Sequence, residues 1–112
     1  MTTIEFNGTE LTVGETTIEV SKPIKDAIIM DGFLVVLLEA DGQQPAESNV
    51  VAYRTDGTVR WYVEPVTAPT NDTNMYVSIW KEGGELWAAD WKGTDYKLSK
   101  ESGSQIETRF RK

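Results

Sequence analysis

Turn signals built on glycine recur along the whole sequence and divide it into short segments. The signals are Asn7-Gly8, Gly14-Glu15, Asp31-Gly32, Asp41-Gly42, Asp56-Gly57, Gly83-Gly84, Lys92-Gly93 and Ser102-Gly103. Between most of them, apolar and polar residues alternate in runs rich in Val, Ile, Thr, Tyr or Trp, and no window of eleven residues sustains a helical period. Such segments are typical of β-hairpins. The sequence therefore predicts an all-β protein.

Eleven strands are expected from this spacing. They lie near residues 2–6, 10–13, 16–20, 26–30, 33–39, 49–54, 59–64, 75–80, 85–90, 94–99 and 104–110. The connections 41–48 and 65–74 are rich in turn residues and are expected to be exposed loops. Residues 33–38 are apolar at successive positions, which predicts a strand covered on both faces. The chain has 112 residues, and we expect residues 1–112 to form one domain.

The composition excludes several kinds of chemistry. The chain has no Cys and no His, so it offers no thiolate or imidazole for catalysis or for binding a metal. Its net charge of -7 disfavours nucleic acid and anionic membranes, which are bound through Lys and Arg. The longest strongly apolar stretch is far shorter than the ~20 residues of a membrane span, and the N-terminus has no signal-peptide pattern. We therefore expect a cytoplasmic protein without metal or cofactor.

The excess of negative charge lies entirely in the first half of the sequence. Residues 1–50 contain nine acidic and two basic residues, whereas residues 51–112 contain nine of each. A solvated face that keeps the protein soluble accounts for this asymmetry. An acidic patch for a basic partner is the alternative.

An internal repeat organises the sequence into two copies, at about residues 17–64 and 75–111. Segments 31–38 and 82–89 both place a turn before a strand, and segments 49–57 and 95–103 both place a strand before a Gly turn. The offset is 52 residues from Gly32 to Gly84 and 46 residues from Gly57 to Gly103, which fits a longer loop in the first copy. A repeat of four short antiparallel strands is the unit of a β-propeller blade.

The first copy resembles the PQQ-like repeat of quinoprotein-type propellers. Asp31-Gly32 and its apolar run are followed by Val51-Ala-Tyr, Asp56-Gly57 and Trp61, as in the family pattern L-Y-A-L-D-x-x-T-G-x-x-x-W. The resemblance is close over residues 17–64 and looser over 75–111, where no closing Trp follows. Residues 84–96 are also similar to the segment G-x-L-W-A-x-x-W-x-G-x-x-Y of short stand-alone bacterial proteins.

The resemblance implies a structural module and no quinone site, because the cofactor of that family sits on the axis of a full ring. A closed propeller needs at least four blades, and this chain has material for about two. We therefore expect two blade-like antiparallel four-stranded sheets packed together, not a closed propeller. Additional N-terminal strands are expected to cap or extend one of them.

Aromatic residues are concentrated in the second half of the sequence. We expect Trp61, Trp80 and Trp87 to fill the core between sheets, with Trp61 as the closing Trp of a blade. The candidate binding residues are Trp91, Tyr96 and Tyr62: Trp91 stands beside a turn, Tyr96 follows the same turn, and Tyr62 alternates with Trp61 along a strand.

Paired carboxylates are the only catalytic chemistry that the composition readily permits. Asp90 and Asp95 flank one turn, with Glu82 and Glu85 nearby, and a glycosidase needs two carboxylates ~5–10 Å apart. Eighteen acidic residues in a chain of this length produce such pairs by chance. Residues 71–74 do not follow the pattern of a calcium loop. We therefore assign no catalytic or metal-binding residue.

The leading hypothesis is a non-catalytic domain that binds another protein or a second copy of itself. A carbohydrate-binding module that uses Trp91 and Tyr96, and a carboxylate-based glycosidase, are the alternatives. The strand at 104–110 is the expected free edge of the fold, although its charged residues are of the kind that protects edges from pairing. Both a monomer and a weak homodimer are compatible with the sequence.

Overall fold

The computed structural model describes residues 4–20, 22–39, 49–65, 75–91 and 93–110, and within these ranges the chain forms β-strands and no helix. The strands are β1 (Ile4–Asn7), β2 (Glu10–Val13), β3 (Thr16–Glu19), β4 (Ile24–Ile29), β5 (Phe33–Leu38), β6 (Val50–Arg54), β7 (Val59–Tyr62), β8 (Tyr76–Glu82), β9 (Glu85–Asp90), β10 (Thr94–Leu98) and β11 (Gln105–Phe110). The all-β prediction is confirmed, and each strand overlaps an expected segment. The expected loop 41–48 and nearly all of 65–74 lie outside the described residues.

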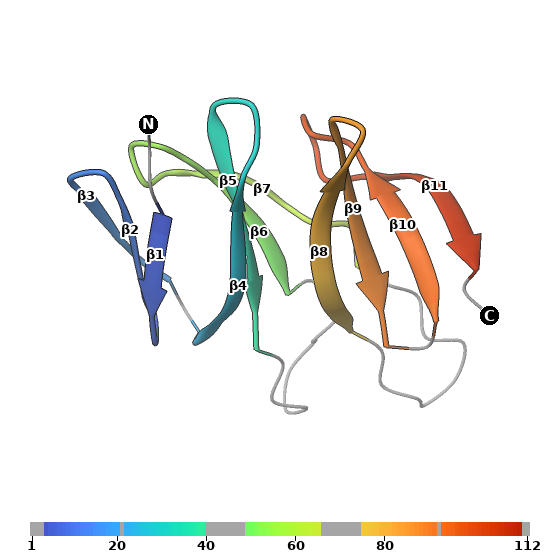
Figure 1. Cartoon of the computed structure of the whole chain (residues 1–112), viewed down its shortest axis with the longest axis horizontal. Helices are drawn as coiled ribbons and strands as arrows, with labels where there is room; N and C mark the ends of the chain where they lie inside the picture. The colour runs from blue at the N-terminus through green and yellow to red at the C-terminus, as the bar shows by residue number, and fades with distance from the viewer. Residues whose placement is uncertain (1–3, 21, 40–48, 66–74, 92, 111–112) are drawn as a thin grey trace.

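The strands form three antiparallel sheets that follow one another along the molecule (Figure 1). The N-terminal sheet is β1-β2-β3, the central sheet is β4-β5-β6-β7 and the C-terminal sheet is β8-β9-β10-β11. In each sheet the spatial order is the order in sequence, so consecutive strands are neighbours. The two expected blade-like four-stranded sheets are thus present, and none of the sheets closes into a barrel or a propeller.

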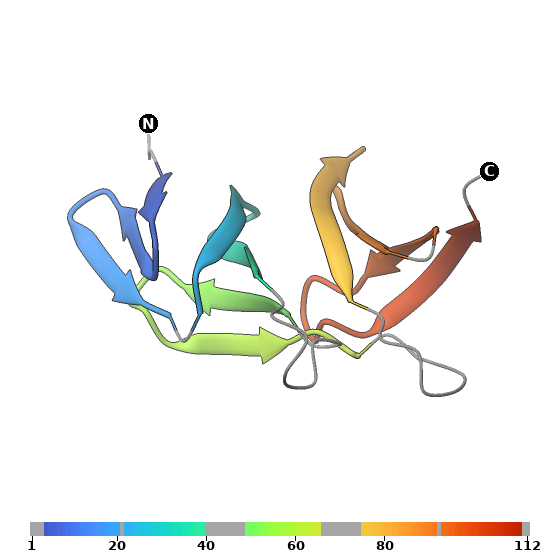
Figure 2. The same cartoon turned by 90° about the horizontal axis from the view of Figure 1, so that it is seen from below.

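Seen from below, the three sheets lie side by side, with the central sheet between the N-terminal and the C-terminal sheet (Figure 2). The first strands of the sheets lie near one another, because β1 contacts β4 and β4 contacts β8. The N-terminal strands form a sheet of their own that packs against the central sheet, so they cap it rather than extend it. The described residues include no helix of the length and apolar character that crossing a membrane requires.

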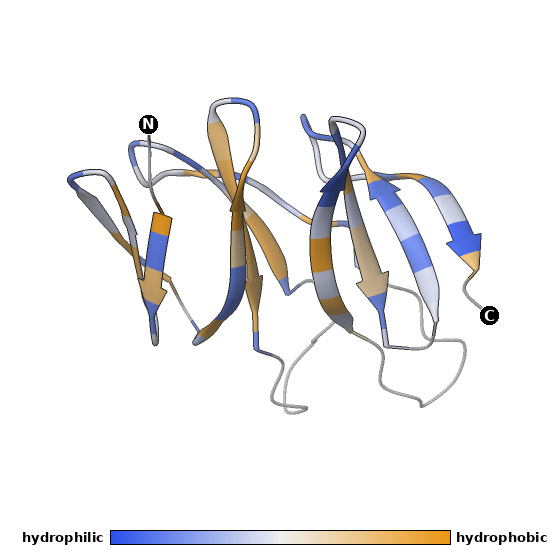
Figure 3. Ribbon diagram, in the orientation of Figure 1, coloured by the Kyte–Doolittle hydropathy of each residue, from blue (hydrophilic) through white to orange (hydrophobic). Residues whose placement is uncertain are grey.

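The central sheet is covered on both faces, as the apolar run in β5 predicts. Successive side chains of a strand point to opposite faces, and all six residues of β5 are buried. Phe33, Val35 and Leu37 face the C-terminal sheet, whereas Leu34, Val36 and Leu38 face the N-terminal sheet. Hydrophobic residues accordingly run the length of β5, while β10 and β11 are mixed (Figure 3).

Two hydrophobic cores result from this stacking. The core between the central and C-terminal sheets contains Met30, Phe33, Val35, Leu37, Val50, Ala52, Trp61, Val63, Tyr76, Ile79, Leu86, Ala88, Tyr96 and Leu98. The core between the N-terminal and central sheets contains Leu11, Val13, Ile18, Val20, Ile24, Leu34, Val36, Leu38, Val51 and Tyr53. The second core has no tryptophan, so the sheets on its two sides are joined by smaller side chains.

Trp61 joins the central sheet to the C-terminal sheet, which confirms its expected place in the core. Its ring meets Phe33 edge to face at 6.4 Å between centroids, and its indole Nε1 donates a hydrogen bond of 2.9 Å to the carbonyl of Lys100. The ring also lies against Gly103, where a Cβ atom would come within 2.4 Å of it. Gly103 has a φ of 77°, so it supplies both the turn and the space for the indole.

Asn49 is a second, polar link between the same two sheets. Its side-chain amide donates to the carbonyls of Leu38 and Tyr76 at 3.0 and 2.8 Å, and its Oδ1 accepts the N–H of Tyr76 at 3.0 Å. The residue is buried, and a buried amide is stable only when its donors and acceptor are satisfied. This link fixes the start of β8 against the end of β5.

Candidate functional site

Two of the three candidate binding residues are exposed, and the third is not. Trp91 and Tyr62 have 65% and 64% of their surface exposed, whereas Tyr96 is buried. Trp91 follows the last residue of β9 in the C-terminal sheet. Tyr62 lies on β7 opposite Val51, on the side of the central sheet that faces the N-terminal sheet. Neither ring stacks on another aromatic ring within the described ranges. The three residues therefore do not form one platform.

Tyr96 is not exposed, because its ring belongs to the core. It packs edge to face on Tyr76 at 5.7 Å, and its hydroxyl donates to Oδ2 of Asp90 at 2.8 Å. Burial, reinforced by the hydrogen bond to the Asp90 carboxylate, raises the pKa of Tyr96 to about 12. Successive side chains of β10 point to opposite faces, so Tyr96 points into the core while Asp95 and Lys97 point outward.

The two candidate catalytic carboxylates point to opposite faces of the C-terminal sheet. Asp90 lies on the core side, where its Oδ1 accepts the N–H of Thr94 at 2.9 Å and so closes the turn before β10. Asp95 lies on the outer face, opposite Ala89, and its Oδ2 is 3.4 Å from a guanidinium nitrogen of Arg109. A glycosidase requires both carboxyl groups at one bond of the substrate. Asp90 and Asp95 cannot meet that requirement from the two sides of a sheet.

The outer face of the C-terminal sheet carries a stack that we call the tryptophan ladder: Trp80, Trp87 and Arg109. The indole rings of Trp80 and Trp87 are nearly parallel, with an interplanar angle of 11° and centroids 6.5 Å apart. The guanidinium of Arg109 covers Trp87 at 4.2 Å from the ring centroid. It also pairs with Glu82 at 3.3 Å. Only 5% of the surface of Trp87 is exposed as a result.

The expectation that Trp80 and Trp87 fill the core is therefore wrong. Both face away from the central sheet, and Trp87 is buried by its neighbours within one sheet rather than between two. The sequence contains the signal for this arrangement: a two-residue turn at Gly83-Gly84 pairs Trp80 with Trp87, and Trp87 alternates with the core residues Leu86 and Ala88.

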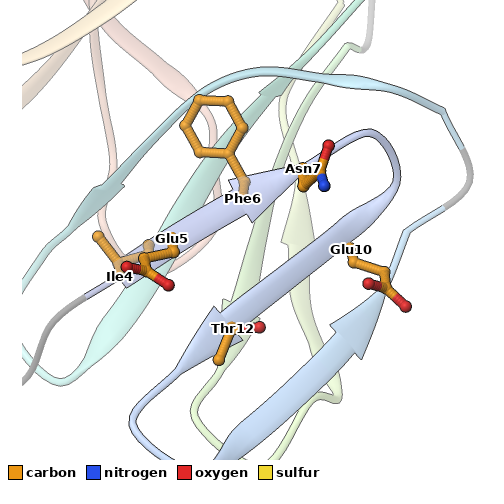
Figure 4. A pocket seen from close by; sticks show the side chains of 6 residues that line it. All are labelled: Ile4, Glu5, Phe6, Asn7, Glu10 and Thr12. Atoms are coloured by element: carbon orange, nitrogen blue, oxygen red, sulfur yellow. The ribbon is translucent and has the colours of Figure 1, made fainter.

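The outer face of the N-terminal sheet is polar and acidic. Glu5 lies opposite Thr12 on the β1–β2 pair, and Glu10 lies directly opposite Glu19 on the β2–β3 pair. An open, shallow groove crosses this hairpin, lined by Ile4, Glu5, Phe6, Asn7, Glu10 and Thr12 (Figure 4). Residues 4–20 contain four carboxylates and no basic side chain. The groove lacks a deep apolar surface that would hold a ligand.

The last strands of the three sheets, β3, β7 and β11, differ in how they are protected. β3 is four residues long and mostly polar, which is the usual protection of an edge. β7 is tied to the turn between β10 and β11, because Trp61 and Arg60 donate side-chain hydrogen bonds to the carbonyl of Lys100. β11 is six residues long, and its only partner among the described strands is β10.

The strand β11 exposes two large apolar side chains. Ile106 and Phe110 have 57% and 78% of their surface exposed. Thr108 lies opposite the buried Tyr96 on the same face and is itself exposed, so the central sheet does not extend over β11. We call residues 106–110, with their outward backbone, the β11 edge. The sequence pattern predicts a free edge at this strand, but it contains no signal that marks Ile106 and Phe110.

The fold and these surfaces define an all-β protein of three stacked antiparallel sheets, with the β11 edge open at the end of the described chain. The family model described as Domain of unknown function (DUF7957) matches residues 1–110, and the chain belongs to this family. No functionally curated protein matches the sequence.

Proposed function

We propose that the chain is a small non-catalytic module that binds another protein by strand addition at the β11 edge. In this mode an extended segment of the partner pairs with an open edge through main-chain hydrogen bonds, and alternate side chains provide selectivity. The observation that carries the proposal is the exposure of Ile106 and Phe110 on β11, a six-residue edge strand whose partner among the described strands is β10 alone.

The comparison with β3 and β7, the last strands of the other two sheets, supports this choice. Natural proteins shorten, charge or cover their edge strands because an open edge pairs with other chains. β3 is short and polar, and the neighbouring turn covers β7, but β11 is long and carries both apolar and charged side chains. Exposed apolar side chains such as Ile106 and Phe110 on an open edge lower the solubility of a protein. Their presence therefore favours a role in binding.

The separation of the carboxylates supports the non-catalytic part of the proposal. Asp90 and Asp95 are engaged on opposite faces of the C-terminal sheet, with Tyr96 and Arg109 respectively. We further propose that the two four-stranded sheets are relatives of PQQ-like propeller blades. The order of the strands and the position of Trp61 four residues after Gly57 support this relationship.

A peptide-display selection tests the proposed function. Short random peptides are selected for binding to the wild-type protein, and the selected peptides are then measured against the Ile106→Lys, Phe110→Lys double variant by isothermal titration. We expect peptides with apolar residues at alternate positions that lose at least about tenfold in affinity for the double variant, because two lysines remove the apolar contacts and charge the edge.

The control is Phe6→Lys, which charges an exposed aromatic position on the opposite end of the molecule. Its affinity for the selected peptides should match that of the wild type. Peptides that bind the double variant and the wild type equally well would place the binding surface elsewhere and overturn the proposal.

A carbohydrate-binding role is the second candidate, and the exposure of Trp91 favours it. Indole rings stack on sugar faces, but Tyr96 cannot assist because it lies in the core. Soluble oligosaccharides titrated against tryptophan fluorescence should give no change if the protein binds only other proteins. A saturable shift that disappears in Trp91→Ala would support carbohydrate binding instead.

A further inference from the structure

The residues of the β11 edge form a pattern that is complementary to itself. Along the strand the order is Ile106, Glu107, Thr108, Arg109 and Phe110, which is apolar, acidic, neutral, basic and apolar. Reversing the direction of the strand exchanges the acid with the base and leaves the apolar ends in place. Two copies placed antiparallel about Thr108 therefore bring Ile106 opposite Phe110 and Glu107 opposite Arg109, each pair twice.

We propose that the partner at the β11 edge is a second copy of this chain, with a two-fold axis passing beside Thr108. This inference rests on the proposed function and names its partner. A two-fold axis perpendicular to the sheet makes the contact isologous, so each favourable pair occurs twice. The two C-terminal sheets would then form one continuous sheet of eight strands.

The other registers are less favourable. An axis beside Glu107 sets that carboxylate against its own copy, and an axis beside Arg109 does the same with two guanidinium groups; like charges directly opposite one another destabilise a strand pair. An axis midway between two residues would set side chains of opposite faces against each other, which a two-fold axis perpendicular to the sheet does not allow. Among these registers, only the one centred on Thr108 combines two apolar pairs with two ion pairs.

Glu107 and Arg109 both have partners over their own sheet within one copy, so each would turn toward the second copy to make these pairs. Glu107 is 3.2 Å from Lys97, and 55% of its side chain is exposed. Arg109 covers Trp87 and pairs with Glu82 and Asp95, with 44% of its side chain exposed. The dimer would thus extend a row of alternating charge, from Lys97 to Glu107 and on to Arg109 of the second copy. Opposite-charge pairs across strands stabilise a sheet.

Single cysteine variants test the register, because the natural chain has no cysteine. In the proposed dimer Thr108 faces its own copy at a Cβ separation of about 4.5–5.5 Å, which is near the range of a disulfide. Ser104 is the control: it is exposed and precedes the same strand, but roughly 27 Å separates it from its copy, since the two are offset by about eight positions at ~3.4 Å each.

We expect Thr108→Cys to form a disulfide-linked dimer at least about tenfold faster than Ser104→Cys, because pairing raises the effective concentration of the two thiols. Non-reducing electrophoresis over time, at one protein concentration and one redox buffer, gives the two rates. Equal rates would show random collision and overturn the inference. The urea midpoints of both variants verify that they are folded.

A pair of charge variants provides a second, independent test. Glu107→Arg and Arg109→Glu should each self-associate about tenfold more weakly than the wild type in sedimentation velocity, since each places like charges opposite one another twice. An equimolar mixture should regain association, because the two variants restore both ion pairs between them. Failure of the mixture to associate, with both variants folded, would overturn the register.

The outcome separates this inference from the proposed function. Peptides that bind the β11 edge together with a slow Thr108→Cys reaction would mean that the partner is a different protein, and only the inference would fail. Arg109→Glu is the variant most at risk of unfolding, because Arg109 contacts Trp87 and Glu82. The Thr108→Cys comparison remains decisive in that case.

Discussion

The two terminal sheets both pack one face against the central sheet, but their outer faces differ in chemical character. Each gives one face to a hydrophobic core, and each leaves the other face without a neighbouring sheet. The N-terminal sheet presents carboxylates and threonines to solvent, with Glu10 directly opposite Glu19. The C-terminal sheet presents the tryptophan ladder and a network of ion pairs. The difference shows two ways of ending a stack of sheets.

The N-terminal sheet ends the stack by alternation, since its outward positions are simply polar. The C-terminal sheet ends it by covering its own large aromatic side chains with a neighbouring ring and a guanidinium. The second solution requires several strands, because the stacked rings and the arginine come from β8, β9 and β11 together. It also extends the sheet beyond the central one, which leaves the β11 edge open.

The largest expected effect concerns the tryptophan that ties the C-terminal sheet to the central sheet. Trp61→Ala should lower the free energy of unfolding by about 3–5 kcal/mol, because it removes a buried ring and the indole hydrogen bond to Lys100. Urea denaturation measures the loss. Tyr62→Ala, at the neighbouring exposed position, should stay within about 0.5 kcal/mol of the wild type. Equal effects would mean that the ring does not join the sheets.

A smaller loss is expected when the space beside this ring is filled. Gly103→Ala should cost about 2–4 kcal/mol, because it adds strain at a φ of 77° and a Cβ atom that overlaps the indole of Trp61. Gly83→Ala is the matched control: its φ of 59° is also positive, but no atom lies within 4 Å of the added Cβ. The difference between the two urea midpoints isolates the contact with Trp61. A zero difference would contradict the packing.

The outer faces of the terminal sheets should respond differently to truncation. Trp80→Ala removes one ring of the tryptophan ladder and should cost about 1–2 kcal/mol, since stacking adds to the apolar area that the ring covers. Thr12→Ala, on the outer face of the N-terminal sheet, should stay within about 0.5 kcal/mol. The quenching of Trp87 fluorescence by iodide should also rise in Trp80→Ala. An unchanged quenching constant would argue against the stack.

The smallest effects should have opposite signs on the two outer faces. The hydrogen bonds from Arg109, and then from Trp80, lower the pKa of Glu82, so its charged form stabilises the fold. This stabilisation is present above the pKa of the unfolded chain and is lost as the pH falls through the lower pKa of the folded state. Glu82→Gln should therefore lower the urea midpoint slightly at pH 7 and have little effect once Glu82 is protonated.

Glu10→Gln is the comparison on the N-terminal sheet. It relieves the repulsion between Glu10 and Glu19, so it should raise the midpoint slightly at pH 7. Both changes should shrink at high salt, because the groups are exposed and their charges are screened. Shifts of the same sign for the two variants would contradict the contrast between the faces.

The strands and their grouping into sheets follow from local patterns. Glycine turns set the hairpins, and the apolar run of β5 identified the strand that is covered on both faces. The repeat of four strands identified the central and C-terminal sheets, including the place of Trp61 in the core. Each of these signals lies within a few residues of sequence, where turn geometry and strand alternation act directly.

The candidate binding residues were predicted less well. Trp91 and Tyr62 are exposed, but Tyr96 is buried and Trp80 and Trp87 leave the core for the outer face. An aromatic residue on a strand has two possible faces, and the sequence of one strand does not reveal which face a second sheet will cover. Only the pairing of Trp80 with Trp87 across the Gly83-Gly84 turn gave a usable signal.

The sequence by itself determined the β class, the hairpin order and the residues that alternate toward one face, because these depend on backbone conformation and on neighbours close along the chain. The tertiary structure alone decided which faces become cores and which edges stay open. Those outcomes depend on contacts between sheets, such as Trp61 with the Lys100 carbonyl and Asn49 with Tyr76, whose partners lie far apart in sequence. The β11 edge is open because no described sheet follows it, and that is a property of the whole stack rather than of the strand.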